Sequence, residues 1–147
     1  MTVALYLDSP EATEKVGAAL LALLPEKALV FLHGELGAGK TTLVRGLLRQ
    51  AGVSGAIKSP TYTVIEEYQG AERKVFHFDL YRLADPQELE WLGIDDYLAQ
   101  LALCLIEWPC KGKGILPPAD VHITLNHQKD GRFLQISGVN IPNNFSI

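Results

Sequence analysis

The sequence predicts an α/β fold, a three-layer sandwich in which a mixed central sheet is flanked by helices and includes β-hairpins. The apolar run Ala28–Leu32 leads into a glycine-rich loop and then into Thr42–Leu48, whose apolar residues share one helical face. This order indicates a buried strand, a loop and a helix. Two pairs of strand-like segments are each joined by turn residues, which indicates hairpins. Two capped starts that contain proline predict further helices.

The length and composition predict one globular domain. The chain has 147 residues, which suits a single domain with a sizeable core, so we expect one domain over 1–147 with 140–147 as a loose C-terminal tail. Hydrophobic residues make up 48% and charged residues 20% of the chain, an ordinary globular balance. The net charge of -4 and the absence of a long basic run argue against strong nucleic-acid binding by the chain alone. Nucleic acid held mainly by a partner protein stays possible.

The two cysteines and the N-terminus bear on the cellular compartment. Cys104 and Cys110 are too few for a disulfide framework or a complete zinc site. We expect Cys104 to be a small core residue in a strand and Cys110 an ordinary surface thiol in a loop. Asp8 and Glu11 lie where a signal peptide would need a basic start and an apolar run, and no apolar stretch is long enough to span a membrane. We therefore expect a cytoplasmic protein with no membrane partner.

The first third of the chain predicts a strand and a helix, which precede the strand, loop and helix around the glycine-rich loop. Val3–Leu7 is a short strand candidate, and Asp8–Glu11 then begins a helix. Either of the first two residues of this segment can be the cap, the second with proline at the first helical position. The helix should end at Pro25, and the helix after the glycine loop should end near Gly52. The apolar face of the first helix consists of Val16, Ala19, Leu20, Leu23 and Leu24.

The middle of the chain predicts a hairpin. A loop over 54–58 and the turn signal Ser59–Tyr62 lead into a strand at Tyr62–Tyr68. Gly70 and its polar neighbours form the turn before a second strand at Lys74–Leu80. Successive residues of this second strand should alternate between two faces, with Val75, His77 and Asp79 on one face and Phe76, Phe78 and Leu80 on the other.

The last third predicts two short helices and more strands. Asp85–Glu88 combines a candidate cap, a proline and a glutamate, and predicts a helix that ends at Gly93. A second short helix should cover Asp95–Gln100. The remaining expected elements are a strand at Leu101–Ile106, a loop at Cys110–Pro118, and a hairpin formed by Val121–Leu125 and Phe133–Ile136 around Asp130 and Gly131.

The glycine-rich loop predicts nucleotide binding. Gly34–Thr41 is a full match to the pattern G-x-x-x-x-G-K-S/T, and its strand and helix flanks are those the pattern needs. Its glycines allow a tight turn that brings backbone amides close to phosphate oxygens at a helix N-terminus. Lys40 would reach the β- and γ-phosphates and the Thr41 hydroxyl would bind Mg²⁺. The fold predicted from this motif is that of the P-loop NTPases.

Two acidic residues are placed to assist hydrolysis. Hydrolysis needs an acid near the metal and a group that orients water. Glu107 ends the apolar Leu101–Ile106 run and Asp79 ends the preceding strand, and ligands bind at the carboxyl ends of parallel strands. Each could instead be an acid that is solvated at a strand end.

Several further residues allow two interpretations. Thr61 could meet Mg²⁺ and the γ-phosphate as a switch threonine, or it could be a turn residue after Pro60. His77 shares the face of Asp79 but could simply be packed in the core. Trp108 could cover the site or pack inside the protein. Arg82, Lys58, Lys111 and Lys113 could assist phosphate binding or be ordinary surface residues.

Four motifs together resemble one family. They are Gly34–Thr42, Ser59–Thr63, His77–Leu83 and Leu105–Pro109, and their order and spacing resemble the TsaE (formerly YjeE) family of bacterial ATPases. The likeness runs from about Leu5 to Arg132. The phosphate loop alone is common to many families, whereas the other three motifs in this order are specific.

The resemblance implies a role in making the threonylcarbamoyladenosine modification of tRNA, next to the anticodon. Such a protein binds ATP and Mg²⁺ and joins a threonylcarbamoyl-transferase heterodimer of TsaB-type and TsaD-type proteins, so it meets tRNA indirectly. ATP hydrolysis, slow alone and dependent on the partner, then supports multiple turnover. By resemblance, ATP binds at Glu35, Leu36, Gly37, Ala38, Gly39, Lys40, Thr41 and Thr42 with Trp108, Pro10 and Arg132 nearby, Mg²⁺ binds at Thr41 and Glu107, and Thr61, Asp79 and Glu107 are catalytic.

Two other functions are compatible with a phosphate loop in a short chain. One is a small nucleoside or small-molecule kinase, but such a kinase usually has an arginine-rich lid that excludes water. The candidate lid, Cys110–Pro118, has lysines and no arginine. The other is a module that binds nucleotide without turnover. The choice of ATP over GTP comes from the resemblance, and the chain has no Asn-Lys-x-Asp motif for guanine.

Overall fold

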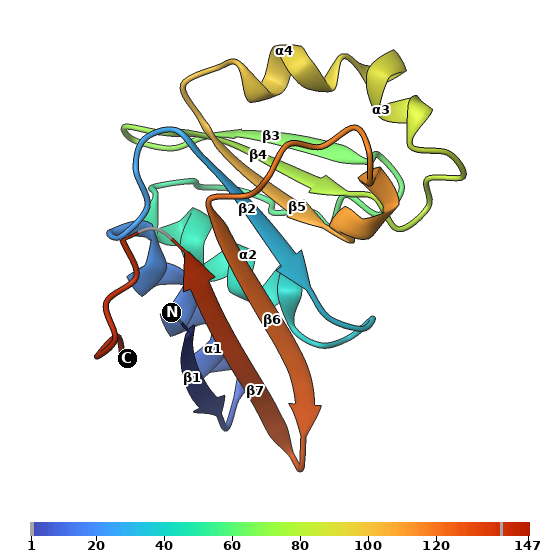
Figure 1. Ribbon diagram of the computed structural model, residues 1–147. Helices are drawn as coiled ribbons and strands as arrows, with labels where there is room; N and C mark the ends of the chain where they lie inside the picture. The colour runs from blue at the N-terminus through green and yellow to red at the C-terminus, as the bar shows by residue number, and fades with distance from the viewer. Residues whose placement is uncertain (1, 139) are drawn as a thin grey trace.

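The computed structural model describes residues 2–138 and 140–147, which form a seven-stranded mixed sheet with helices on both faces (Figure 1). The strand order is β1-β7-β6-β2-β5-β4-β3. The strands are β1 (Thr2–Leu7), β2 (Ala28–His33), β3 (Ile65–Gln69), β4 (Lys74–Asp79), β5 (Leu103–Glu107), β6 (Val121–Gln128) and β7 (Gly131–Gly138). The helices are α1 (Pro10–Leu21), α2 (Lys40–Gln50), α3 (Gln87–Leu92), α4 (Ile94–Leu98) and the short 3₁₀ helix η1 (Pro109–Gly112).

The centre of the sheet is parallel and its two edges are antiparallel. β2 lies between β5 and β6 and runs parallel to both, and β4 runs parallel to β5. A central parallel strand is covered on both faces, which explains why β2 is apolar almost throughout. The two predicted hairpins are present, with β3–β4 at one edge and β6–β7 followed by β1 at the other. β6 alternates between buried and exposed residues, as a half-covered strand should.

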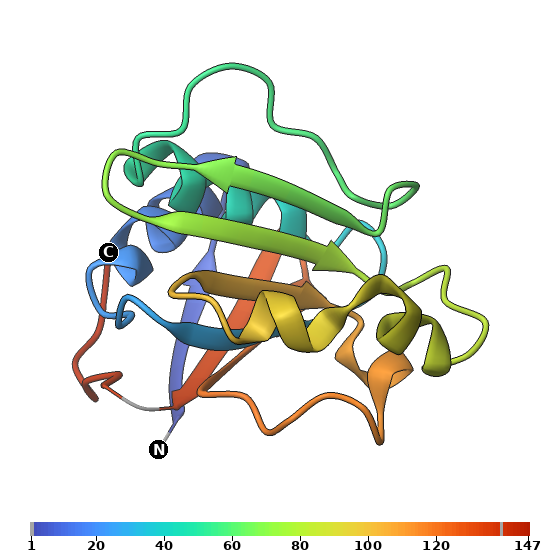
Figure 2. The ribbon, with the colours of Figure 1, turned by 90° about the horizontal axis from the view of Figure 1, so that it is seen from above.

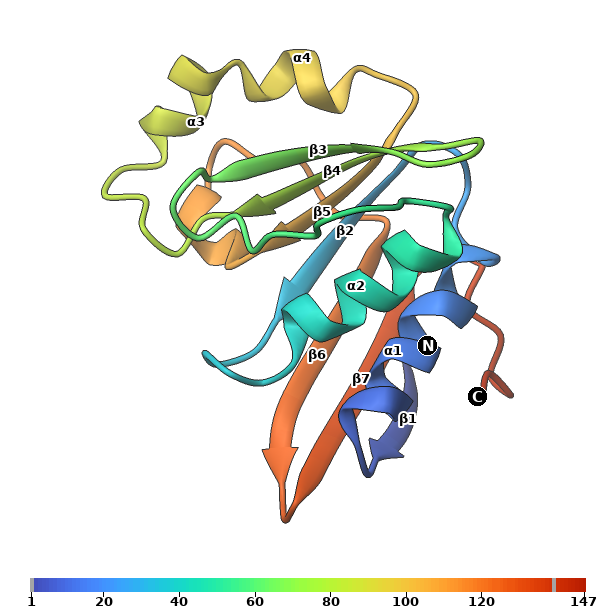
Figure 3. The same cartoon turned by 180° about the vertical axis from the view of Figure 1, so that it is seen from behind.

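Two core clusters fill the spaces between sheet and helices. Helices α1 and α2 cover one face of the sheet, and α3 and α4 cover the opposite face beside β3, β4 and β5 (Figures 2 and 3). The side chains of β4 divide between the two clusters as the alternation predicts: Val75 joins the cluster under α1 and α2, and Phe76, Phe78 and Leu80 join the cluster under α3 and α4.

Helices α1 and α2 are in backbone contact at two glycines. A Cβ atom on Gly17 would lie 2.0 Å from the carbonyl oxygen of Leu43, and one on Gly46 would lie 2.0 Å from the carbonyl oxygen of Glu14. Neither distance is sterically possible. Both positions therefore require glycine because of the close approach of the two helices.

The predicted helix starts are confirmed. At α1 the amide of Ala12 donates to Ser9 Oγ at 3.1 Å and Pro10 is the first helical residue, so Ser9 is the cap. Before α3 the amide of Gln87 donates to Asp85 Oδ1 at 2.9 Å, and Glu88 Oε2 accepts from the Asp85 amide at 3.0 Å. These reciprocal bonds form the capping box that the sequence predicts.

The strand predicted from Tyr62 begins three residues later, at Ile65. The amide of Val64 donates to the carbonyl of Pro60 at 2.8 Å, and Val64 has a left-handed backbone with φ +70°. This hydrogen-bonded turn overrides the strand preference of the β-branched residues within it.

Other boundaries also differ from those predicted: α4 covers Ile94–Leu98, β4 ends at Asp79, and β6 and β7 extend to Gln128 and back to Gly131, closer to their turn than expected. Helix α1 ends at Leu21, before Pro25, and the chain leaves it through turns in which Leu23 and Leu24 donate to carbonyls three residues earlier. Strand β5 begins at Leu103, because Leu101 is exposed and precedes the pairing with β2.

The segment 140–147 has no helix or strand and most of its residues are exposed. Two of its residues contact the core: Ile141 is buried in the cluster under α1 and α2, and Phe145 packs against the same cluster. Cys104 is buried and Cys110 is exposed, as predicted. Among the described residues, no helix combines the length and the apolar character needed to cross a bilayer.

Candidate functional site

The predicted phosphate loop connects β2 to α2 and has the expected backbone. Gly34, Gly37 and Gly39 have φ values of +148°, +77° and +108°, which residues with a side chain rarely adopt. The loop opens directly into helix α2, which begins at Lys40. The first amides of this helix are thus available to an anion.

Lys40 is held against the loop itself. Its side chain is buried, and Nζ donates to the carbonyl oxygens of Gly34 and, at 3.3 Å, Glu35. The same ammonium lies 4.4 Å from the ring centroid of Trp108. Burial lowers the pKa of Lys40, and the negative charges of Glu107, Asp79 and Glu35 oppose that shift.

The two predicted acids lie side by side at the carboxyl ends of β4 and β5. Asp79 and Glu107 are paired in register, and Glu107 also pairs with Leu32 of β2, just before the phosphate loop. Both acids are buried, with exposed fractions of 5% and 3%. The sheet therefore brings the loop and both carboxylates to one edge, as expected for neighbouring parallel strands.

Each carboxylate has its own hydrogen-bond partners. Asp79 Oδ2 accepts from Thr61 Oγ1 at 3.2 Å, and Asp79 Oδ1 accepts from the amide of Tyr81 at 3.0 Å. The hydroxyls of Ser59 and Thr61 are 2.8 Å apart. Glu107 Oε2 lies 2.6 Å from Nε2 of the completely buried His77.

These groups line one cleft of about 290 Å³. The phosphate loop and the start of α2 form one side of it, and the segment that contains Ser59 and Thr61 contributes to it together with the two acids. The cleft residues are Leu36, Gly37, Ala38, Gly39, Lys40, Thr41, Thr42, Ser59, Thr61, Asp79 and Glu107. Glu35 is exposed beside it and meets Lys40 through its carbonyl.

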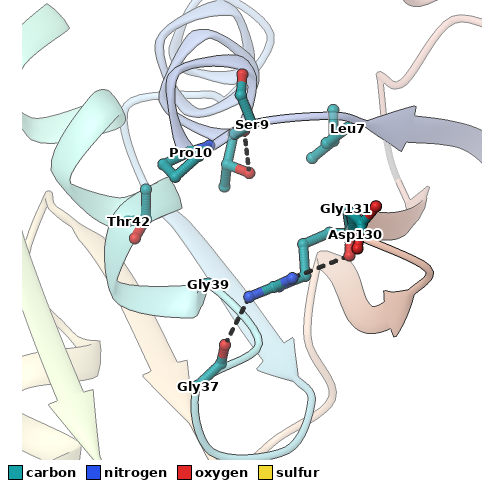
Figure 4. Close-up of a pocket in the computed structure, with 10 residues that line it drawn as sticks. Leu7, Ser9, Pro10, Gly37, Gly39, Thr42, Asp130 and Gly131 are labelled. Atoms are coloured by element: carbon teal, nitrogen blue, oxygen red, sulfur yellow. Dashed lines mark hydrogen bonds between the residues drawn. The ribbon is translucent and has the colours of Figure 1, made fainter.

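A second pocket of about 200 Å³ lies on the other side of the loop (Figure 4). Ser9, Pro10 and Thr13 at the start of α1 line it together with Thr42 and Arg132, so the N-terminal segment and β7 lie beside the loop. Its other residues are Leu7, Gly37, Gly39, Asp130 and Gly131.

Arg132 is tied to the phosphate loop by its guanidinium. Nε donates to the carbonyl of Ala38 at 2.9 Å and a terminal nitrogen donates to the carbonyl of Gly37 at 3.2 Å, the latter drawn in Figure 4. A third bond goes to the carbonyl of Gly131 at 2.9 Å. Two loop carbonyls are therefore turned toward Arg132.

Trp108 lies next to Lys40 and packs against the core cluster under α3 and α4. It is half-buried, it has a left-handed backbone with φ +56°, and its ring meets the Tyr81 ring at a centroid distance of 4.9 Å. A non-glycine residue in this conformation is held there by its surroundings. Trp108 does not line the described cleft, so it combines contact with Lys40 and packing inside the protein.

Other candidate residues lie away from the cleft. Arg82 stacks on the exposed Tyr62 ring at 4.5 Å, and the backbone of Lys58 bonds to Tyr68 Oη. Lys111 and Lys113 are exposed around η1. None of these four residues lines the described cleft.

Two contacts next to the site are not predicted by the sequence patterns. His77 is packed in the core, as one of its two interpretations predicts, and it also contacts Glu107; its place on the Asp79 face is the signal that could have found this contact. Ser59 lines the cleft and contacts Thr61, whereas the sequence pattern indicates only a turn there.

The donor set suits magnesium bound together with phosphates. Within the described residues, no group of three or more histidine, cysteine, aspartate or glutamate side chains is arranged to hold a metal ion. Mg²⁺ takes one or two protein oxygens and completes its shell with phosphates and water. The Thr41 hydroxyl and the Glu107 carboxylate line the same cleft and fit that requirement.

Comparison with known proteins identifies the family of this chain. Residues 7–134 match the family described as threonylcarbamoyl adenosine biosynthesis protein TsaE. The chain belongs to the TsaE family. It is 52% identical over 124 residues to the tRNA threonylcarbamoyladenosine biosynthesis protein TsaE of Haemophilus influenzae, covering 84% of this chain and 78% of that protein.

More distant relatives share the family and the fold. The TsaE protein of Bacillus subtilis is 34% identical over 122 residues, covering 83% of this chain and 76% of the relative. The crystal structure of Bacillus subtilis YdiB superposes with a TM-score of 0.81 at 26% identity, covering 95% of this chain and 86% of that one. The α/β fold with its mixed sheet is therefore that of a solved relative.

Proposed function

We propose that this TsaE-family chain is a P-loop ATPase, a three-layer sandwich over 1–147, that supports the threonylcarbamoyladenosine modification of tRNA next to the anticodon. The observation that carries the proposal is the cleft in which the phosphate loop meets Thr61, Asp79 and Glu107. A loop alone would hold a nucleotide, whereas two buried carboxylates and a hydroxyl beside it supply what hydrolysis needs. Family membership supplies the pathway.

ATP binds along the loop. The amides of Glu35 to Thr42 surround the phosphates, and Lys40 exchanges its bonds to the Gly34 and Glu35 carbonyls for bonds to phosphate oxygens. The burial that lowers the pKa of Lys40 also strengthens its attraction to an anion. The nucleoside lies toward the pocket that Pro10 and Arg132 line, and Trp108 lies against the Lys40 ammonium.

Thr41 and Glu107 hold the magnesium ion of Mg·ATP. The ion neutralises charge on the β- and γ-phosphates when it is bound. Asp79 holds the Thr61 hydroxyl through the 3.2 Å hydrogen bond, so the segment that carries Thr61 is linked to the acid beside the metal. Asp79 and Thr61 are placed to orient the attacking water and to sense the γ-phosphate.

ATP binding and hydrolysis act by changing the conformation of the protein. ATP orders the Thr61 segment, this order favours binding to a threonylcarbamoyl-transferase heterodimer of TsaB and TsaD type, and hydrolysis reverses the order. The tRNA is met through that complex in the cytoplasm, which agrees with the chain's net charge of -4. Hydrolysis by the chain alone is slow, because the partner completes the arrangement.

Calorimetric titration with Mg·ATP tests the central assignment. Lys40→Ala removes two charged contacts to phosphate worth about 1.5 kcal/mol each, which predicts a loss of affinity of roughly 100-fold. Lys113→Ala removes an exposed lysine outside the cleft and should bind as the parent does. Parent-like binding by Lys40→Ala would show that the loop is not the nucleotide site.

Turnover of tRNA modification tests the pathway. The heterodimer is assayed with tRNA and ATP, with and without this chain and with its Glu107→Gln and Asp79→Asn variants. We expect multiple turnover only with the parent, and a fall of at least about 100-fold in ATP hydrolysis for each variant, as for lost groups that stabilise charge in a transition state. Turnover that is unchanged by the chain would refute the role in this pathway.

A further inference from the structure

His77 is a buried polar residue to which the proposed function gives no task. It lies in the middle of β4, two residues before Asp79, and its side chain has no exposed surface. Its register partner on β5 is Leu105, two residues before Glu107. The imidazole therefore lies directly behind the two acids, away from the cleft, and its Nε2 reaches Glu107 Oε2 at 2.6 Å.

The second ring nitrogen decides which atom carries the proton. Nδ1 of His77 is buried and has no hydrogen-bond partner among the described residues. A proton on Nδ1 would bury a donor without an acceptor, which is the costly arrangement for a polar group. Nε2 therefore carries the proton of this hydrogen bond, and Nε2–H donates to the Glu107 carboxylate, which can only accept.

We propose that His77 is a positioning residue for the magnesium site. Its Nε2–H bond fixes Oε2 of Glu107 and leaves Oε1 for the cation, so the carboxylate meets the metal in one orientation. Because the ring is completely buried in β4, it cannot follow Glu107 if the acid rotates. Hydrogen-bonded support of this kind behind a metal ligand commonly sets metal affinity. The inference rests on the proposed role of Glu107 in binding Mg²⁺.

Two substitutions separate the hydrogen bond from the bulk of the ring. His77→Gln places an amide N–H near the position of Nε2 and keeps a donor to Glu107, whereas His77→Leu fills similar space without a donor. His127→Gln is the matched control, because His127 is exposed on β6 outside the cleft. Thermal unfolding of each variant shows that it is folded before binding is measured.

The measurement is ATP affinity with Mg²⁺ and with a chelator in place of Mg²⁺. We expect His77→Leu to reduce the gain in affinity from magnesium by about tenfold or more, with affinity in chelator unchanged. His77→Gln should keep most of the gain and His127→Gln all of it. A parent-like gain in His77→Leu, an equal loss in His77→Gln, or an equal loss with and without magnesium would overturn the proposal.

Nitrogen NMR of the unmodified protein tests the tautomer without any ligand. We expect the chemical shift of a protonated nitrogen at Nε2 of His77. An unprotonated Nε2 would refute the assignment of His77 alone. A parent protein whose ATP affinity does not change with Mg²⁺ would instead refute the proposed function, so the two failures are distinguishable.

Discussion

Arg132 holds the phosphate loop in shape, and its removal should weaken nucleotide binding. Its guanidinium donates to the carbonyls of Ala38 at 2.9 Å and Gly37 at 3.2 Å. With those carbonyls fixed, the neighbouring amides are kept free to face the phosphates. A hydrogen bond to a charged group contributes about 1.5–3 kcal/mol when buried. Arg132 is only half-buried, so we take about 1 kcal/mol for each bond.

The sum of about 2 kcal/mol corresponds to a dissociation constant for ATP that is roughly 30-fold larger in Arg132→Ala than in the parent. Calorimetry with ATP and with inorganic tripolyphosphate measures this loss, and a loss of loop order should weaken both ligands equally. Lys129→Ala, which removes a neighbouring exposed charge from the same hairpin, should bind both as the parent does. Parent-like binding by Arg132→Ala refutes the reasoning, and a loss confined to ATP would mean that Arg132 contacts the nucleoside.

Two further predictions concern packing and thiol chemistry. Gly46→Ala should lower the free energy of unfolding by about 1–3 kcal/mol or more, because the new Cβ would lie 2.0 Å from the Glu14 carbonyl oxygen. An unchanged melting temperature would contradict the close helix contact. Burial raises the pKa of Cys104 to about 11, so at pH 8 iodoacetamide should modify the exposed Cys110 alone. Intact mass should show one adduct in the folded protein and a second only after unfolding or as the pH approaches 11; two adducts at pH 8 would contradict the burial.

Much of the site was predictable because its parts are marked locally. The loop pattern and its apolar flanks fix Lys40 at a helix start, and strand ends mark Asp79 and Glu107. The pairing of the two acids was not predictable in the same way. It depends on β4 lying next to β5, which is a tertiary choice that neither segment's pattern contains.

The same distinction explains what the sequence did not predict. His77 and Glu107 are separated by 30 residues and meet only through strand pairing, so the pattern of β4 indicates a face and not a partner. The turn before β3 is stabilised by the hydrogen bond from the Val64 amide to the Pro60 carbonyl and by the hydrogen bond from the Thr61 hydroxyl to Asp79. These bonds outweigh the preference of the residues in the turn for a strand.

The backbone contact between α1 and α2 determines which side of the site can respond to a nucleotide. Gly17 and Gly46 let the two helices pack backbone against backbone, so the Ser9 end of α1 and the phosphate loop that precedes α2 belong to one closely packed unit. The segment 54–64 on the other side is mostly exposed, and few buried contacts hold it. The site thus has one closely packed side and one loosely packed side. In the proposed function, nucleotide binding should therefore change the outer surface of the protein mainly around Tyr62, which has 83% of its surface exposed.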